Sequence, residues 1–169
     1  VAVIDTQSGR TLEIIGSALF PTAPNGSTPN SLALSKDGQI LLIANADNNN
    51  LAVINVSERG GAKPMGFIPV GWYPTSVRFV PQGNILVASG KGLSPRSNRH
   101  GPQPGVAAKN VREYIGGLHK GSLSFIKMPD AKELATHTAQ AFACSPLRKG
   151  SAVVDKSREA DNPIPAAVG

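Results

Sequence analysis

Val1–Asp5 reads Val-Ala-Val-Ile-Asp, and the pattern returns 50 positions later as Leu-Ala-Val-Ile-Asn at Leu51–Asn55. A weaker third copy, Leu-Ser-Phe-Ile-Lys, occupies Leu123–Lys127. Each copy is a short apolar run that turn-forming residues flank, which is typical of a β-strand. Three similar strands at long intervals indicate an internal repeat.

A second repeated pattern lies between the first two of these strands. Thr28–Asn45 returns 45 positions later as Tyr73–Gly90. Each copy begins with a Pro-led strand, passes through a turn that contains Asp37-Gly38 or Gln82-Gly83, and ends in a closing strand. Such a turn favours a hairpin, because glycine adopts positive φ without a steric penalty.

The repeat has the size of a β-propeller blade, which is a sheet of four short antiparallel strands in roughly 40 to 50 residues. The chain is also turn-dense, with 18 Gly and 14 Pro among 169 residues. We therefore predict an all-β fold: a partial β-propeller of about two to three four-stranded blades, followed by a short helix and an extended linker. The blades are assigned to residues 1–128, with repeat units from 1 and 51 and a third strand set from 122.

A helix is predicted over residues 129–148. Asp130 and Glu133 have the spacing of a capping box, in which each side chain accepts a hydrogen bond from the other residue's backbone. Leu134, Thr138 and Phe142 follow at helical spacing. The remaining residues, 149–169, are predicted to be a connector.

The interval 90–121 interrupts the repeat, and excursions of this length are usually functional or linkers. Residues 91–127 carry seven basic residues and one acidic residue, so their net charge of +6 equals the formal net charge of the whole chain. A loop of this composition could bind an anion, because Arg offers a fork of donors and Gly lets backbone N–H groups converge. The candidate ligand-binding residues are Lys91, Arg96, Arg99 and His100. The alternative is a solvated basic loop, and nucleic acid is disfavoured because only Tyr114 lies among these charges.

Metal and nucleophile motifs are lacking in the sequence. The three histidines, His100, His119 and His137, have no short-range pairing, so we predict no metal site and no cofactor in this segment. No Gly-x-Ser-x-Gly motif occurs, and Cys144 is interpreted as a small buried residue or an incidental thiol. No catalytic residue is therefore assigned.

Two further groups have a structural and a functional interpretation. The amide-rich run Asn45–Asn50 could ligate Ca²⁺, but a tight turn is favoured because Asn and Asp tolerate left-handed backbone. Trp72 and Tyr73 could meet a ligand near a propeller axis, but packing between blades is favoured because aromatic rings bury large apolar areas. No apolar run is long enough to span a membrane as a helix.

The repeat resembles the YVTN-type β-propeller repeat of YncE-like and lactonase-like propellers. The resemblance is carried by Ile68–Val77, by the Val-Ala-Val-Ile-Asp strand, and by closing strands in which Leu42–Asn45 is aligned with Val87–Gly90. The second closing strand departs from the family pattern. The interval 90–121 and the strand after it further resemble bacterial proteins that join such a propeller to an alkaline-phosphatase-like phosphoesterase domain.

This resemblance implies a non-catalytic ligand-binding or scaffolding module in a longer, exported protein of the periplasm or cell surface. Its implied partners are the remaining propeller blades, a C-terminal phosphoesterase domain that uses divalent metal, and a small-molecule ligand. Two alternatives stay open: part of a lactonase-like hydrolase, or an anion- or nucleic-acid-binding surface. Because repeats bury their faces only against neighbours, we also expect the isolated chain to be marginally stable or prone to aggregation.

Overall fold

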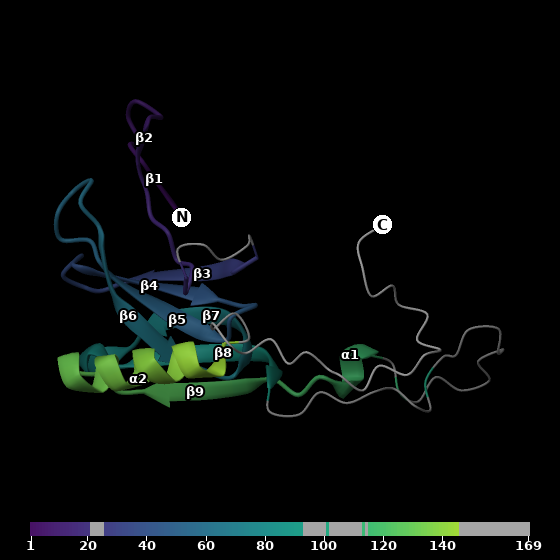
Figure 1. Ribbon diagram of the computed structural model, residues 1–169. Coiled ribbons are helices and arrows are strands. Elements are labelled where there is room, and N and C mark those ends of the chain that lie inside the picture. The colour runs from purple at the N-terminus through teal and green to yellow at the C-terminus, as the bar shows by residue number, and fades with distance from the viewer. Residues whose placement is uncertain (21–25, 93–100, 102–112, 114, 146–169) are drawn as a thin grey trace, which may run out of the picture.

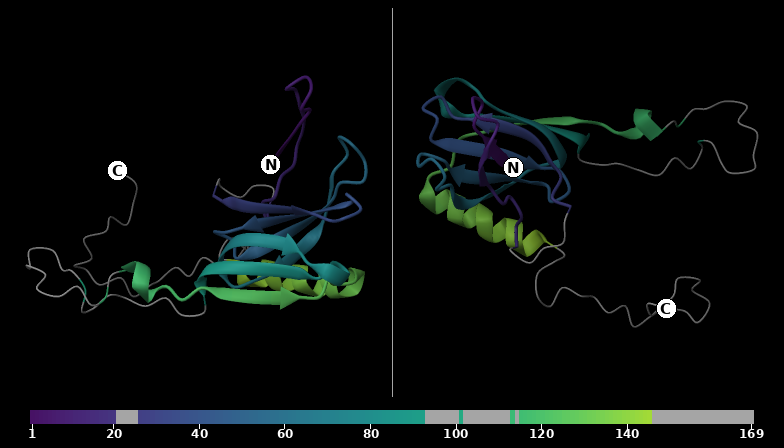
Figure 2. Two further views of the ribbon diagram at one scale, coloured as in Figure 1. Left: turned by 180° about the vertical axis from the view of Figure 1, so that it is seen from behind. Right: turned by 90° about the horizontal axis from the view of Figure 1, so that it is seen from above.

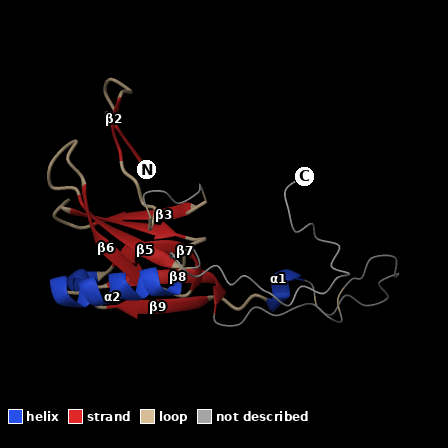
Figure 3. Cartoon of the chain, in the orientation of Figure 1, coloured by secondary structure: helices blue, strands red, loops and turns tan. Residues whose placement is uncertain are grey.

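The computed structural model describes residues 1–20, 26–92, 101, 113 and 115–145. Within these residues, nine strands form three antiparallel sheets, so the chain is mostly β as predicted (Figures 1 and 3). The first two sheets contain β1 (Ala2–Ile4), β2 (Thr11–Ile14), β3 (Pro29–Leu34), β4 (Ile40–Asn45), β5 (Asn50–Asn55) and β6 (Lys63–Pro69). The third contains β7 (Trp72–Phe79), β8 (Ile85–Gly92) and β9 (Ser122–Ile126). The helices are α1 (Ile115–Leu118) and α2 (Ala131–Cys144), with a 3-10 turn at Pro81–Gly83.

The three sheets are called here the hairpin (β1–β2), the central sheet (β3–β4–β5–β6) and the third sheet (β7–β8–β9). The central sheet follows chain order, and every neighbouring pair of its strands is antiparallel. It combines the Pro-led and closing strands of the first repeat unit with the strand pair that opens the second unit. The sequence repeat is therefore out of phase with the sheets, because the turn Ala46–Asn49 joins β4 to β5 within one sheet.

Successive residues of a strand point to opposite faces of its sheet, so each strand of the central sheet contributes side chains to both faces. Both faces are covered. One face contributes Leu42, Ala44, Leu51 and Val53 to a core shared with Val77, Ile85 and Val87 of the third sheet. The opposite face contributes Ile43, Ala52, Ile54 and Phe67 to a core shared with the chain around Val1, Val3 and Ile15–Phe20. The continuous apolar run Ile40–Ala44 is thus a strand buried on two sides, which is why it does not alternate with polar residues.

The central and third sheets meet along their first strands, where β3 and β7 are in close contact. The Val77 N–H donates to the Ser31 hydroxyl at 3.1 Å, and the Arg78 guanidinium donates to the same oxygen at 3.2 Å. Figure 2 shows these two sheets lying one over the other, with α2 along one side of them. Face-to-face packing at this seam buries one apolar face of each of the two sheets.

Strand pairing corrects the sequence alignment of the closing strands by one residue. Pro29 pairs with Asn45 in the central sheet, and the equivalent Pro74 pairs with Ser89 in the third sheet. Ser89, not Gly90, is therefore the structural counterpart of Asn45. The physical cause is a turn that is one residue shorter: Ser35 N–H donates to Ile40 O, whereas Val80 N–H donates to Asn84 O. The second closing strand accordingly reads Leu-Val-Ala-Ser beside Leu-Ile-Ala-Asn in the first.

Helix α2 begins where the capping pattern predicts. The Asp130 side chain accepts from Glu133 N–H at 2.8 Å, and the Glu133 side chain accepts from Asp130 N–H at 3.0 Å. The helix packs along β6, the outer strand of the central sheet. Leu134 joins the core between the two large sheets, and Phe142 stacks edge-to-face with Phe20 and Phe67. The predicted connector, residues 149–169, lies outside the described residues.

The hairpin stands away from the rest of the molecule, at the top of Figure 1. It is joined to the central sheet by its polar turn, where the Arg59 guanidinium bonds the Asp5 carboxylate at 2.9 Å. The Glu13 carboxylate also accepts from Ala62 N–H at 2.9 Å. Both links reach the loop between β5 and β6.

Candidate functional site

The β4–β5 turn, the β6–β7 connection and the end of β8 lie together at one end of the two large sheets. At the base of this end lie two buried amides, Asn45 and Asn50. The Asn45 amide nitrogen donates to Ser17 O at 2.8 Å and to the Asn50 side-chain oxygen at 3.0 Å. The Asn50 amide nitrogen donates to Asn48 O at 3.2 Å. The amides thus hold the turn and the segment before β3 together, and the interpretation of Asn45–Asn50 as a turn is confirmed.

Asn49 connects this turn to the third sheet. Its backbone carbonyl accepts from Val70 N–H, and its side-chain oxygen accepts from Tyr73 N–H, both at 2.9 Å. Asn49 and Tyr73 have φ values of 52° and 62°, so both lie in the left-handed region. Asparagine tolerates this conformation, but for a bulky residue such as Tyr73 it is a strained outlier. The amide of Asn49 therefore helps to hold Tyr73 in a conformation that the residue alone would avoid.

Tyr73 and its neighbour Trp72 form an aromatic pair with the ammonium of Lys91 over both rings. The Lys91 Nζ atom lies 4.4 Å from the Tyr73 ring centroid and 5.7 Å from that of Trp72. Both separations are within the range of cation–π attraction. Trp72 is 46% exposed, so the prediction that it packs between blades is wrong. Trp72 is the first residue of β7 and pairs with Gly92, beyond the buried apolar residues of the third sheet.

The chain enters and leaves the basic interval 90–121 beside this cluster. Gly92 pairs with Trp72 and has a φ of +59°. A Cβ atom at Gly92 would lie 1.5 Å from the Lys120 carbonyl oxygen, so the chain after the excursion passes against the chain before it. Of the predicted ligand-binding residues, the structure places Lys91 at this position. Arg96, Arg99 and His100 lie outside the described residues.

The sequence predicted a turn at Asn49 but not its link to the third sheet, and it did not pair Trp72 and Tyr73 with Lys91. The three segments are far apart in the sequence, and only strand pairing brings them together. A usable signal was present in the run Asn48-Asn49-Asn50, because asparagine is common where left-handed backbone is needed. The pattern indicates a turn but does not say which neighbouring strand the turn contacts.

A cavity of about 340 Å³ adjoins the same turn. It lies between the turn and the end of α2, and its lining residues include Asn48, Asn50 and Gln140. Cys144 also lines it and is exposed, so of its two interpretations the buried residue is wrong and the incidental thiol is left. A larger hollow of about 1010 Å³ lies between the β3–β4 and β7–β8 turns and includes Phe79 and Met128.

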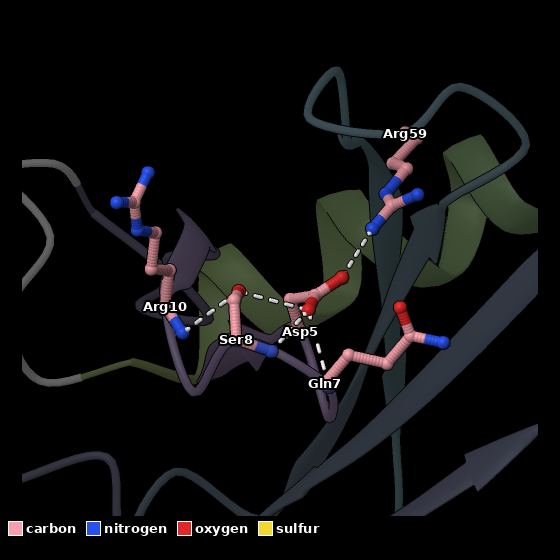
Figure 4. A network of polar contacts seen from close by, with 5 residues as sticks. All are labelled: Asp5, Gln7, Ser8, Arg10 and Arg59. Atoms are coloured by element: carbon pink, nitrogen blue, oxygen red, sulfur yellow. Dashed lines mark hydrogen bonds and ion pairs between the residues drawn. The ribbon is translucent and has the colours of Figure 1, made fainter.

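Two carboxylates among the described residues have a lowered pKa, Asp5 and Asp37, and each accepts hydrogen bonds within a turn. In Figure 4, Asp5 accepts from the N–H groups of Gln7 and Ser8, from the Ser8 hydroxyl and from Arg59. The hydrogen bond from Ser8 N–H is the largest of the effects that lower the pKa of Asp5. The pKa of Asp37 is lowered first by the hydrogen bond from the Ser35 hydroxyl, within the β3–β4 turn.

No group of three His, Cys, Asp or Glu side chains that could hold a metal ion occurs in the described part of the chain. Neither described helix is both long and apolar enough to cross a membrane.

No family model and no curated protein matches the chain. Among solved structures, hydrazine synthase of Kuenenia stuttgartiensis matches 37% of this chain at 25% sequence identity, with a TM-score of 0.34. The match spans 17% of the hydrazine synthase chain.

Proposed function

We propose that this chain is a non-catalytic binding module built from part of a YVTN-type β-propeller. In this proposal the central sheet is a complete blade, the hairpin is the outer half of the preceding blade, and the third sheet is three strands of the following blade. Support comes from the meander order of the central sheet and from the packing of β3 on β7, which would both be innermost strands. The equivalence of the β1, β5 and β9 sequences supports the same assignment.

The proposed ligand-binding surface is the cluster of Trp72, Tyr73 and Lys91. The observation that carries this proposal is the Lys91 ammonium lying over two aromatic rings, one of which is about half exposed. The ammonium offers donors to an anion, and the Trp72 ring offers a face for stacking. The combination suits a small anionic ligand with a flat or apolar part, because charge and stacking contribute separately to its binding.

The wider context of the proposal comes from resemblance alone. A propeller of this kind would belong to an exported protein and would be joined to a metal-dependent phosphoesterase domain. In that context the module positions a phosphorylated ligand and the other domain carries out the chemistry.

Trp72 is the single tryptophan of the chain, so its fluorescence reports directly on the proposed surface. Titration with inorganic phosphate at constant ionic strength should produce a saturable change in this fluorescence. Substitution of Lys91→Gln should weaken the apparent affinity about tenfold or more, because a hydrogen bond to a charged group contributes roughly 1.5–3 kcal/mol. The measurement is the dissociation constant from the fluorescence titration.

The control is Lys63→Gln, which removes a lysine of the same charge from the start of strand β6; this side chain is exposed and paired with Glu58, whereas Lys91 is half-buried. This variant should bind phosphate like the unmodified chain. An equal response of the Lys91→Gln variant, or an equal response of the unmodified chain to chloride, would exclude the proposed surface. Near-ultraviolet circular dichroism checks that each variant keeps its tertiary packing.

A further inference from the structure

The hollow between the β3–β4 and β7–β8 turns is a second candidate binding site, at the opposite end of the sheets from Trp72. Strand pairing defines the two ends: Trp72 pairs with Gly92 at one end of the third sheet, and Phe79 pairs with Ile85 at the other. The hollow has a volume of about 1010 Å³ and opens to solvent between the two turns. Its size suits a small molecule, since sites for such ligands usually enclose roughly 300–1,000 Å³.

The floor of the hollow is apolar. Ile40, Phe79 and Met128 line it, and all three are half-buried. The same residues pack against the core that the central and third sheets share. That core is therefore open to water at this end, and an apolar molecule in the hollow would extend it. Covering this surface is favourable, because hydrophobic stabilisation rises with the apolar area removed from water.

The two turns beside the hollow use polar backbone groups internally. In the β3–β4 turn, Ser35 N–H donates to Ile40 O, and in the β7–β8 turn, Val80 N–H donates to Asn84 O. The next residue, Pro81, has no N–H to offer. A bound peptide would need partners for its own backbone groups, and these turns provide few. An alkyl chain needs none, so the backbone of the hollow favours it over a peptide.

The charged side chains at the hollow leave positive charge unpaired. The Asp37 carboxylate accepts from the Ser35 hydroxyl at 2.5 Å and from Gln39 N–H at 3.1 Å. Lys36 lines the hollow, and Lys127 is the chain neighbour of a lining residue. Both lysines are exposed, and no side chain in the described part of the molecule forms an ion pair with either. A negatively charged head group would therefore find a partner at the rim.

We propose that this hollow binds a fatty-acid-like molecule, with its alkyl chain on Ile40, Phe79 and Met128 and its carboxylate at Lys36. The apolar floor selects the chain, and the unpaired positive charge at the rim selects the head group. The site does not use the Trp72 cluster, so it goes beyond the proposed function. It also differs from the exposed faces of the sheets: in the proposed propeller, further blades would stand beside the hairpin and the third sheet, whereas the hollow lies between two sheets that this chain supplies.

The two methionines of the chain make the test direct, because Met128 lines the hollow and Met65 lies on β6. Labelling the methionine methyl groups of the whole chain with ¹³C gives one NMR signal for each, and Met128→Leu and Met65→Leu assign them. Dodecanoate, added below its micelle concentration, should shift the Met128 signal saturably and leave the Met65 signal in place. Dodecyltrimethylammonium carries the same chain on a positive head group and should bind at least about threefold more weakly, because an exposed charge contributes modestly.

Variants separate the head-group contact from the chain contact. Lys36→Gln should weaken dodecanoate binding about threefold, as expected for the loss of an exposed ion pair. Lys63→Gln, at the start of β6, should leave the affinity unchanged. Met128→Gln places a polar group on the floor and should weaken binding about tenfold in calorimetry, because the amide would be desolvated. Met65→Gln is the matched control and should bind like the unmodified chain, since Met65 is exposed on β6.

Three results would overturn the proposal: a Met128 signal that does not move in millimolar dodecanoate, equal shifts of both methionine signals, or unchanged affinity of the Met128→Gln variant. Binding to the exposed sheet faces instead would leave the Met128 signal in place. A shift of Met128 by the peptide acetyl-Leu-Phe-Glu-amide, but not by dodecanoate, would make a protein segment the occupant and would also overturn the proposal. The phosphate titration at Trp72 is a separate measurement, so either site can fail without the other.

Discussion

Gly66 shows how closely a single residue limits the packing of α2. A Cβ atom at Gly66 would lie 2.3 Å from the Thr138 hydroxyl oxygen and 3.1 Å from Leu134 Cγ. The Thr138 hydroxyl accepts from Phe67 N–H at 2.9 Å and donates to Leu134 O at 2.7 Å. The helix therefore satisfies a backbone donor of the outer strand and blocks part of an edge that could otherwise pair with another chain.

Replacement of Gly66→Ala should lower the free energy of unfolding by about 2 kcal/mol, because the new methyl group overpacks the contact and displaces Thr138. Urea denaturation measures this change. Gly16→Ala is the control, since no atom lies within 4 Å of a Cβ placed there. Equal stability of the Gly66→Ala chain would mean that α2 does not pack on β6 as described.

Asn45 and Ser89 show how equivalent positions diverge. Asn45 ends β4, whereas Ser89 lies within β8, and both are almost fully buried. Asn45 uses its amide nitrogen to tie Ser17 and Asn50 together, whereas Ser89 lies against Gly71, where a Cβ atom would be only 2.9 Å from its hydroxyl oxygen. The longer Asn45 side chain fits the central sheet. The third sheet holds the shorter Ser89 side chain, because the backbone at Gly71 passes close to it.

At the scale of elements, the hairpin depends on polar links more than on its core. The Asp5 carboxylate both organises the turn between β1 and β2 and binds Arg59 of the β5–β6 loop. Its hydrogen bonds favour the ionised form, which lowers the pKa of Asp5 below the ordinary value of 3.8. The stabilisation from this lowered pKa is present above pH 3.8 and is lost as the pH falls through the folded-state pKa.

Titration of the Asp5 carboxyl carbon by NMR should therefore give a midpoint below 3.8. In an Asp5→Asn variant the hairpin should be destabilised at neutral pH, and its stability should change less than that of the unmodified chain as the pH falls below 4. A midpoint at or above 3.8 would show that the turn network does not form in solution. Because the Arg59 side chain is 74% exposed, high salt should weaken its link to Asp5.

At the scale of the whole molecule, stability is distributed unevenly among the sheets. The central sheet is packed on both faces, the third sheet on one face, and the hairpin mainly through Val1 and Val3. Repeat proteins gain most of their stability from contacts between neighbours. The central sheet should therefore be the most stable part, and the hairpin should open first.

Native-state hydrogen exchange should show this order. Backbone amides in β4 and β5 should exchange at least about a hundredfold more slowly than those in β1 and β2, because local opening costs little where few apolar groups are buried. Exchange read out by mass spectrometry on peptides from each strand separates the two classes. Uniform protection of all three sheets would contradict the description of the hairpin as a weakly packed element.

Much of the local structure could be predicted from the residues. Strand positions, the Gly38 and Gly83 turns and the start of α2 all depend on short-range preferences, and each appears in the structure. The candidate site was only partly predictable. Lys91 stood out by its charge, but its position over Trp72 and Tyr73 depends on the pairing of β7 with β8, which no local pattern contains.

By itself, the sequence determined that this protein is a chain of short antiparallel strands in a repeat, because strand and turn preferences depend on neighbouring residues. Only the tertiary structure decided where one sheet ends and the next begins, because a repeat can be divided at any turn and only hydrogen-bonded pairing selects one division. Pairing also decided that Ser89 corresponds to Asn45. Burial decided the rest: equivalent apolar positions are covered in the central sheet and uncovered in the third, since exposure depends on neighbouring sheets and not on residue type.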